Sequence, residues 1–170
     1  ATCDGAFFRN KITAVVGGGD VAVEDAIYLA RMCEKVYLIH RRDEFRAAKS
    51  LVNKAKNTEN IELVLDSTVE RISGEAKVSS IEVKNKITGN TDEFAVDGVF
   101  FAVGMQPVTA FVDKSVQMNE AGYIVAGEDC ATNVPGVYAA GDIRTKQLRQ
   151  IITAAADGAN AVASVEKYIL

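Results

Sequence analysis

The sequence predicts an α/β fold with a doubly wound parallel sheet, followed by the partial core of a second domain. Apolar, β-branched segments alternate with segments of helical spacing over residues 11–65. A glycine-rich turn separates the first strand from the first helix. The last third of the chain contains too few elements to close a core. With 170 residues, the chain suits one domain, or one domain and part of another.

Strands and helices alternate in the first part of the chain. Lys11–Val16 is apolar and β-branched, and Asp20–Glu34 has apolar residues at helical spacing. Lys35–Ile39 is a second strand and Ile61–Leu65 a third. Between them, Asp43–Asn57 is predicted to form a helix with its first residue as the N-cap. This order predicts parallel strands joined by right-handed crossovers.

An antiparallel meander is expected next. Thr68–Ile72, Lys77–Ile87 and Thr91–Val96 alternate polar and apolar residues, and Thr88–Asn90 forms a turn between the last two. Gly98–Val103 then reads as another buried strand. The meander is therefore an insertion before the last strand of the sheet.

The chain leaves this sheet through a Gly-Met-Gln-Pro sequence. We interpret it as the boundary between a domain at residues 1–106 and a segment at residues 107–170. This segment is expected to contain short strands at Tyr123–Val125 and Gly136–Ala140 and a helix at Arg149–Tyr168. Two strands and a helix cannot close a core, so the segment is expected to be part of a larger domain.

Composition limits the classes of partner. Hydrophobic residues make up 48% of the chain and charged residues 25%, as in a soluble globular protein. A net charge of −4 gives no reason to expect nucleic acid or an acidic membrane surface as a partner. The apolar stretches are far shorter than the ~20 residues of a membrane span. Three widely spaced cysteines, Cys3, Cys33 and Cys130, fit a reducing cytosol, so we expect a cytoplasmic protein.

The turn after the first strand has the dinucleotide-binding pattern G-x-G-x-x-A at residues 17–22. Gly17 allows the tight turn, Gly19 lets the backbone approach a pyrophosphate, and Ala22 lets helix and strand pack closely. The helix dipole and exposed N–H groups would then hold the phosphates. The alternative is a plain glycine turn, which the strand–turn–helix context disfavours.

The end of the second strand indicates which nucleotide binds. NAD sites place an acidic residue there, whereas this strand runs into His40, Arg41 and Arg42. Arg46 is expected one helical turn after Arg42, on the same face. Guanidinium groups bind a 2′-phosphate in bidentate fashion, which predicts NADPH. Asp43 follows the basic residues, where helix capping explains it; the alternative for the basic residues is a solvated helix start.

Five segments together resemble the low-molecular-weight, bacterial-type thioredoxin reductases. The resemblance runs along nearly the whole chain, and the His-Arg-Arg-Asp and Cys-Asp-Gly sequences are its most specific parts. The segments are residues 3–5, 17–24, 38–47, 136–142 and 149–151. The resemblance implies a C-terminal part of such an enzyme: a Rossmann-like NADPH-binding domain followed by the second half of an FAD-binding domain.

The resemblance also implies a redox mechanism and partners. In this family NADPH reduces FAD, FAD reduces a Cys-x-x-Cys disulfide, and the dithiol reduces thioredoxin. Cys3 matches the second cysteine, which faces the flavin, and its partner would stand one position before Ala1. Asp4 matches a proton-shuttling acid, a role that burial would support by raising its pKa. The intact enzyme would be a homodimer. Taken without the resemblance, Cys3 is better explained as an idle terminal cysteine.

Site residues follow from the pattern and the resemblance together. Those expected to bind NADPH are Gly17, Gly18, Gly19, Asp20, Val21, Ala22, His40, Arg41, Arg42, Arg46 and Gly104. Those implied for FAD are Gly141, Asp142, Arg149, Gln150 and Ile151. Asp142 could instead be an N-cap or turn residue. Phe7 and Phe8 either pack into the domain or form an apolar patch for thioredoxin.

Two other functions fit parts of the pattern. The flavoprotein of alkyl hydroperoxide reductase shares the fold and the Cys-x-x-Cys motif, but we find no His-Arg-Arg match in its second strand. A non-catalytic NADP-binding module would not need Cys3 or Asp142. This chain alone is expected to bind NADPH, but neither to retain FAD nor to turn over.

Overall fold

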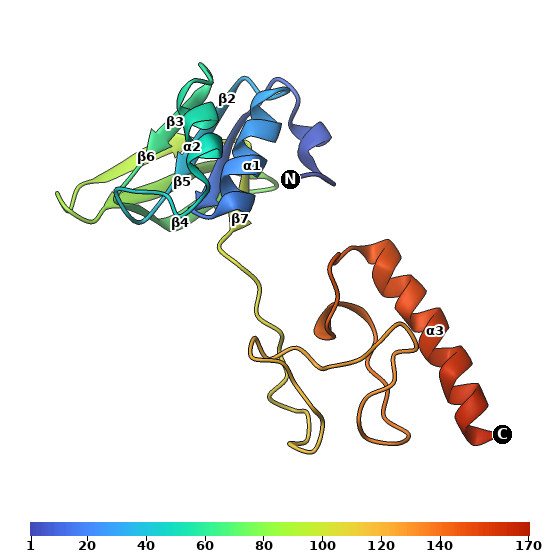
Figure 1. Ribbon diagram of the computed structural model, residues 1–170. Coiled ribbons are helices and arrows are strands. Elements are labelled where there is room, and N and C mark those ends of the chain that lie inside the picture. Colours follow the sequence, from blue (N-terminus) through green and yellow to red (C-terminus); the bar gives the residue numbers. More distant parts are fainter. The chain divides into compact units, whose positions relative to one another are not determined.

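The computed structural model describes residues 1–170, and the chain forms two compact units, Ala1–Gly104 and Met105–Leu170 (Figure 1). The boundary expected from the sequence follows Gln106. The assignment of the units to an NADPH-binding and an FAD-binding domain remains a prediction. None of the helices combines the length and apolar character that crossing a bilayer requires.

A four-stranded parallel sheet organises the first unit, in the order β3-β2-β1-β7. Its strands are β1 (Ile12–Gly17), β2 (Lys35–Ile39), β3 (Ile61–Val64) and β7 (Gly98–Ala102). Val16 pairs with Ile39, and Gly17 pairs with Ala102. The carboxyl ends of β1, β2 and β7 therefore meet at one edge of the sheet.

The two faces of this sheet have different covers. Val15 and Leu38 pack with helices α1 (Asp20–Ala30) and α2 (Lys49–Lys56). Ala14 and Ile39, their neighbours in β1 and β2, point to the other face and pack in a second core. Since side chains alternate along a strand, adjacent residues of β1 and of β2 are buried in different cores, one on each face of the sheet.

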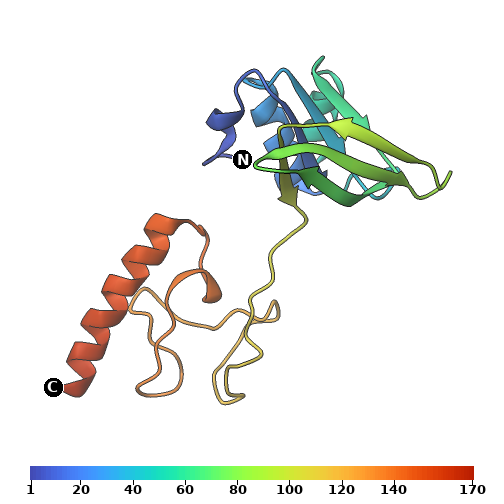
Figure 2. The ribbon, with the colours of Figure 1, turned by 180° about the vertical axis from the view of Figure 1, so that it is seen from behind.

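The antiparallel meander covers the second face. It consists of β4 (Ser67–Gly74), β5 (Val78–Asn85) and β6 (Thr91–Ala95), paired in that order (Figure 2). Ile81 and Val83 of β5 are buried in the core that contains Ile39. The predicted α/β class with an inserted meander is confirmed, and the meander takes the place that helices have in other doubly wound sheets.

The first helix is shorter than expected. It ends at Ala30 rather than Glu34, and Arg31 is its C-cap. Cys33 therefore does not lie on the helix, although it is buried in the helix-side core as expected. The chain turns early because the N–H of Glu34 bonds the carbonyl of Lys11, which starts the pairing of β2 with β1.

The second helix begins six residues later than predicted, at Lys49. Asp43 is thus not an N-cap; Ala48 occupies that position, without a side-chain cap. Residues 41–48 form an irregular loop because they are bound to the glycine turn, as described below. The charged and helix-favouring composition of this loop gave no sign of these long-range hydrogen bonds.

The second unit contains one long helix and few paired strands. The strands expected at Tyr123–Val125 and Gly136–Ala140 are only isolated bridges. Each of these bridges involves single residues, so no ladder forms to extend a strand. The helix α3 spans Ile151–Ile169, and a 3-10 helix, η2, spans Gly141–Ile143. A small hydrophobic core of this unit consists of Val116, Ile124, Ala126 and Ala139.

A buried ionic cluster ties this second unit together. Asp157 accepts two hydrogen bonds from the Arg144 guanidinium, both at 2.7 Å, and one from the Lys146 ammonium at 2.8 Å. It also accepts the N–H of Gly141 at 2.8 Å. The cluster fixes the start of η2 to α3.

Candidate nucleotide-binding site

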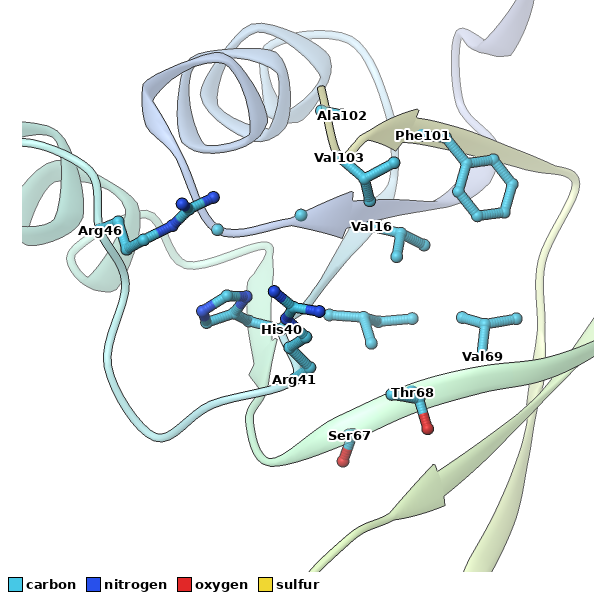
Figure 3. Close-up of a pocket in the computed structure, with 13 residues that line it drawn as sticks. Val16, His40, Arg41, Arg46, Ser67, Thr68, Val69, Phe101, Ala102 and Val103 are labelled. Carbon is cyan, nitrogen blue, oxygen red and sulfur yellow. The ribbon is translucent and has the colours of Figure 1, made fainter. Parts of the chain in front are cut away.

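A cavity of about 260 Å³ opens at the edge where the parallel strands end (Figure 3). It is formed by the ends of β1, β2 and β7, the start of β4 and the loop after β2. The residues that line it are Val16, Gly17, Gly18, Ile39, His40, Arg41, Arg46, Ser67, Thr68, Val69, Phe101, Ala102 and Val103. Ligands of open α/β sheets bind at this edge.

The cavity has a basic end and an apolar end. Figure 3 shows His40, Arg41 and Arg46 gathered on one side, with Phe101 and Val103 on the other. The apolar side chains are exposed by 60% and 68%. Such an arrangement suits an extended ligand that carries phosphate at one end and a flat apolar group at the other.

The three glycines of the turn have different surroundings. A Cβ atom on Gly17 would meet the Cβ of Ala22 at 2.7 Å, and one on Gly18 would overlap the His40 ring. A Cβ on Gly19 would meet nothing within 4 Å. Gly17 and Gly18 are therefore required by packing within the protein, whereas Gly19 faces open space, as a backbone that approaches a pyrophosphate would.

The start of α1 is also open to a ligand. Gly19 is the N-cap of this helix, and no side chain caps it. Its first backbone N–H groups and the positive end of the helix dipole therefore point toward the space in front of Gly19. The helix start at the predicted position thus has uncapped N–H groups of the kind that bind anions.

His40 is buried beside this turn, with 5% of its surface exposed. Burial lowers the pKa of its imidazole; a hydrogen bond with the Glu44 backbone opposes this, and the charges of Arg42, Arg46 and Arg41 add to the lowering. The neutral ring stacks on Phe45 with centroids 5.2 Å apart. Its Nε2 atom is buried without a hydrogen-bond partner. A buried polar atom in this state calls for a partner, which a ligand in the cavity would supply.

The arginines expected to bind a 2′-phosphate lie on the loop after β2, not on a helix. Arg41 and Arg46 line the cavity, whereas Arg42 does not. The expectation that Arg42 and Arg46 share a helical face is wrong, because residues 41–48 are not helical. The carbonyl of Arg42 accepts the N–H of Asp66, which holds that part of the loop against the end of β3.

Of the other expected NADPH residues, those at positions 19–22 continue the turn into α1 without lining the cavity. Ala22 is fully buried, and Val21 is 63% exposed. The Asp20 carboxylate accepts the N–H of Ala48 at 2.8 Å. Gly104, with φ of 100°, does not line the cavity.

The candidate redox residues lie before the first strand, in the first unit. Cys3 and Asp4 are exposed, and neither lines the cavity. Asp4 precedes the 3-10 helix η1 (Gly5–Phe8). Phe8 packs edge-on against Phe100 at 5.1 Å, whereas Phe7 is 76% exposed. Phe8 therefore packs into the domain, whereas Phe7 is exposed and available for contact with a partner.

The residues implied for FAD lie together in the second unit. The guanidinium Nε of Arg149 donates to the Asp142 carbonyl at 3.2 Å, and the same side chain lies 4.0 Å from the centre of the Tyr123 ring. Gln150 caps α3, and Ile151, its first residue, is 91% exposed. Gly141 has φ of 80°, which favours glycine there.

Several lining residues were not foreseen from the sequence. Phe101, Ala102 and Val103 follow directly from the rule that ligands bind where parallel strands end, once β7 is placed beside β1. Ser67 and Thr68 carry no such signal, because their position depends on how the meander folds back over the sheet.

Comparison with known proteins gives a family and several relatives. A family model for pyridine nucleotide-disulphide oxidoreductases matches residues 2–158. The thioredoxin reductases of Helicobacter pylori and Peptoclostridium acidaminophilum are 48% and 45% identical to this chain over 99% of its length. The chain spans about half the length of these curated relatives, 56% in both cases.

Solved structures agree with the sequence relatives. The crystal structure of thioredoxin reductase from Streptococcus pyogenes matches 98% of this chain and has a TM-score of 0.88 at 44% identity. Thioredoxin reductase from Giardia duodenalis matches 99% of the chain and has a TM-score of 0.80 at 39% identity. The chain covers 55% and 56% of those two proteins.

Proposed function

The chain belongs to the pyridine nucleotide-disulphide oxidoreductase family, and from this premise we propose that it supplies the NADPH site of a thioredoxin reductase. The observation that carries the proposal is the cavity at the carboxyl edge of the parallel sheet. Two guanidinium groups line it, and the open Gly19 and the uncapped start of α1 follow directly in the chain on its lining residue Gly18.

The cavity fits NADPH better than NADH. The pyrophosphate has a place in front of Gly19, at the start of α1. Arg41 and Arg46 suit the additional 2′-phosphate, and no acidic side chain lines the cavity to bind a 2′-hydroxyl instead. Arg42, next to Arg41 on the same loop, adds positive charge to this end.

His40 has a positioning role in this proposal. Its ring fills the space that a side chain on Gly18 would need, so it fixes the backbone of the turn. The neutral imidazole leaves Nε2 available for one hydrogen bond to a nucleotide or to a water bound with it. At the apolar end, Phe101 and Val103 would hold the nicotinamide, which supplies a hydride when NADPH is bound.

The remainder of the proposed function extends to the intact protein. Gly141, Asp142, Arg149, Gln150 and Ile151 would contribute to an FAD site, where the flavin supplies the redox step between nicotinamide and disulfide. Cys3 would be one thiol of a Cys-x-x-Cys centre, and Asp4 its proton donor. Thioredoxin would be the final acceptor, as in the reductases that the chain resembles.

Replacing Gly19 with alanine tests the proposed site. The new methyl group meets no protein atom within 4 Å, so the fold should be retained. It would stand where the pyrophosphate lies, and each lost hydrogen bond to a charged group is worth about 1.5–3 kcal/mol. Calorimetric titration should show NADPH and NADH weakened alike, by about tenfold or more.

Gly158→Ala is the matched control. Gly158 also has open space around its Cβ position, but it lies in α3, in the other unit. This variant should bind nucleotide as the unmodified chain does. Unchanged binding in Gly19→Ala would show that the glycine turn is not the phosphate site.

A further inference from the structure

An acidic residue at the start of α1 is unexpected beside a phosphate site. Asp20 is the first residue of the helix, directly after Gly19, and its charge would repel the pyrophosphate of either nucleotide. A favourable interaction of the carboxylate with the helix dipole offers one reason for its presence. The contacts of its side chain offer another.

The Asp20 carboxylate joins the helix start to a distant segment. Its Oδ1 atom accepts the backbone N–H of Ala48 at 2.8 Å, across 28 residues of sequence. Ala48 is the N-cap of α2 and has no side-chain cap of its own. This hydrogen bond therefore fixes the last residue of the loop that follows β2.

A second hydrogen bond holds the same loop to the glycine turn. The N–H of Arg46 donates to the carbonyl of Gly18 at 2.8 Å. Between β2 and Ala48, the loop carries all three arginines of the basic cluster. The loop is thus fastened to the phosphate-binding turn at two neighbouring points, one from the backbone and one from a side chain.

We propose that Asp20 is a positioning residue for nucleotide specificity, which acts by fastening the arginine loop to the start of α1. The inference rests on the proposed NADPH site and names the residue that orders its 2′-phosphate end. Its carboxylate turns toward Ala48 rather than toward the ligand. The loop that would bind the 2′-phosphate is thereby ordered before the nucleotide arrives, which lowers the entropy cost of binding.

The ratio of NADPH to NADH affinity isolates this effect. Both nucleotides carry the pyrophosphate, so any change in its repulsion or in the helix dipole cancels in the ratio. Only the 2′-phosphate differs, and it contacts only the arginine loop in this proposal. A change in the ratio therefore reports on the order of that loop.

The experiment compares Asp20→Ala with Asp20→Asn, by calorimetric titration with each nucleotide and by amide hydrogen exchange. Asparagine keeps an oxygen that can accept the Ala48 N–H, whereas alanine does not. In Asp20→Ala, the NADPH-to-NADH affinity ratio should fall by about three- to tenfold, the worth of one hydrogen bond. The Ala48 amide should exchange faster, and Asp20→Asn should restore both properties.

Glu24→Ala removes an exposed acid of the same helix whose side chain makes no hydrogen bond or ion pair, and should change neither property. Unchanged exchange at Ala48 in Asp20→Ala, or an unchanged affinity ratio, would overturn the inference while leaving the NADPH site intact. An unmodified chain without any preference for NADPH would overturn the proposed function, and this inference with it.

Discussion

Arg41 and Arg46 reach one end of the cavity from a loop that is bound to the glycine turn by the Arg46 N–H. Their identity could be read from the sequence, because two arginines after a strand that normally ends in an acid point to a 2′-phosphate. Their placement could not, since it depends on hydrogen bonds between the loop and residues 28 positions away in the chain.

Removing both arginines that line the cavity should abolish the preference for NADPH. In the double variant Arg41→Ala, Arg46→Ala, NADPH binding should weaken by about tenfold or more, while NADH binding should change little. Arg71→Ala, which removes an exposed arginine from β4, is the control and should bind both nucleotides normally. An equal loss for both nucleotides in calorimetry would refute the assignment of the basic end.

His40 is the one histidine of the chain, so its titration can be followed without ambiguity by NMR. Burial lowers the pKa of its imidazole, so the titration midpoint should lie below the ordinary value of about 6.5. A midpoint at or above that value would contradict the buried, neutral ring.

The same shift predicts a pH dependence of stability. The unfolded state binds the proton more tightly than the folded state, so the contribution of His40 to stability is fully present above pH of about 6.5. It is lost as the pH falls from there through the lower folded pKa. The melting temperature of the unmodified chain should decrease over that range, and His40→Gln should lack this part of the decrease.

Elements that depend on local pattern were predicted well. β1, β2 and α1 begin within one residue of the expected positions, because their apolar periodicity and the glycine turn are local signals. The start of α2 at Lys49 was not predictable in that way. Phe45 stacks on His40 and the loop bonds the glycine turn, and these tertiary contacts override the helical propensity of residues 43–48.

In the second unit, too, the elements depend on tertiary contacts that local sequence patterns do not reveal. Its expected strands have the composition of strands, but each pairs with its neighbours at single residues only, so isolated bridges form instead of a sheet. Asp157 and Arg144 were not singled out, although they make the most buried polar contacts of that unit. An aspartate within a helix gives no signal until its partner is placed beside it.

Replacing Asp157 should destabilise the second unit strongly. Asp157→Ala would leave the Arg144 guanidinium buried without its partner, which typically costs about 3–5 kcal/mol. The unfolding transition of α3, followed by circular dichroism in urea, should move to lower denaturant concentration. Asp113→Ala, an exposed aspartate of the same unit, should have little effect. Equal effects of the two would contradict a stabilising role of the cluster.

Acid should weaken the same cluster. Hydrogen bonds from Arg144 hold the pKa of Asp157 well below its usual range. The stability that this carboxylate contributes is therefore present above the ordinary aspartate pKa of about 3.9 and is lost as the pH falls below it.

The helix α3 exposes an apolar face that a complete domain would bury. Ile151, Ile152 and Val162 are exposed by 91%, 75% and 69%. The chain spans about half the length of its relatives, and the resemblance assigns its second unit to part of an FAD domain. The sequence predicted that this segment has too few elements to close a core, and the exposed face of α3 agrees with that prediction.

The purified chain should therefore be colourless and inactive by itself. It should show no flavin absorbance after gel filtration with added FAD, and it should not oxidise NADPH in the presence of thioredoxin. The physical reason is that, in the function we propose, Gly141, Asp142 and the start of α3 would supply only one side of a flavin site. A yellow preparation with stoichiometric FAD would show that the second unit is more complete than we propose.

The selectivity of the first unit for NADPH can be measured by a pair of calorimetric titrations of the unmodified 170-residue chain, with NADPH and with NADH, at the same pH and ionic strength. We expect saturable binding of both nucleotides, with NADPH bound about tenfold or more tightly, since two charge-assisted contacts are added by the 2′-phosphate. Equal affinities, or binding of NADH alone, would refute an NADPH-selective site in this unit.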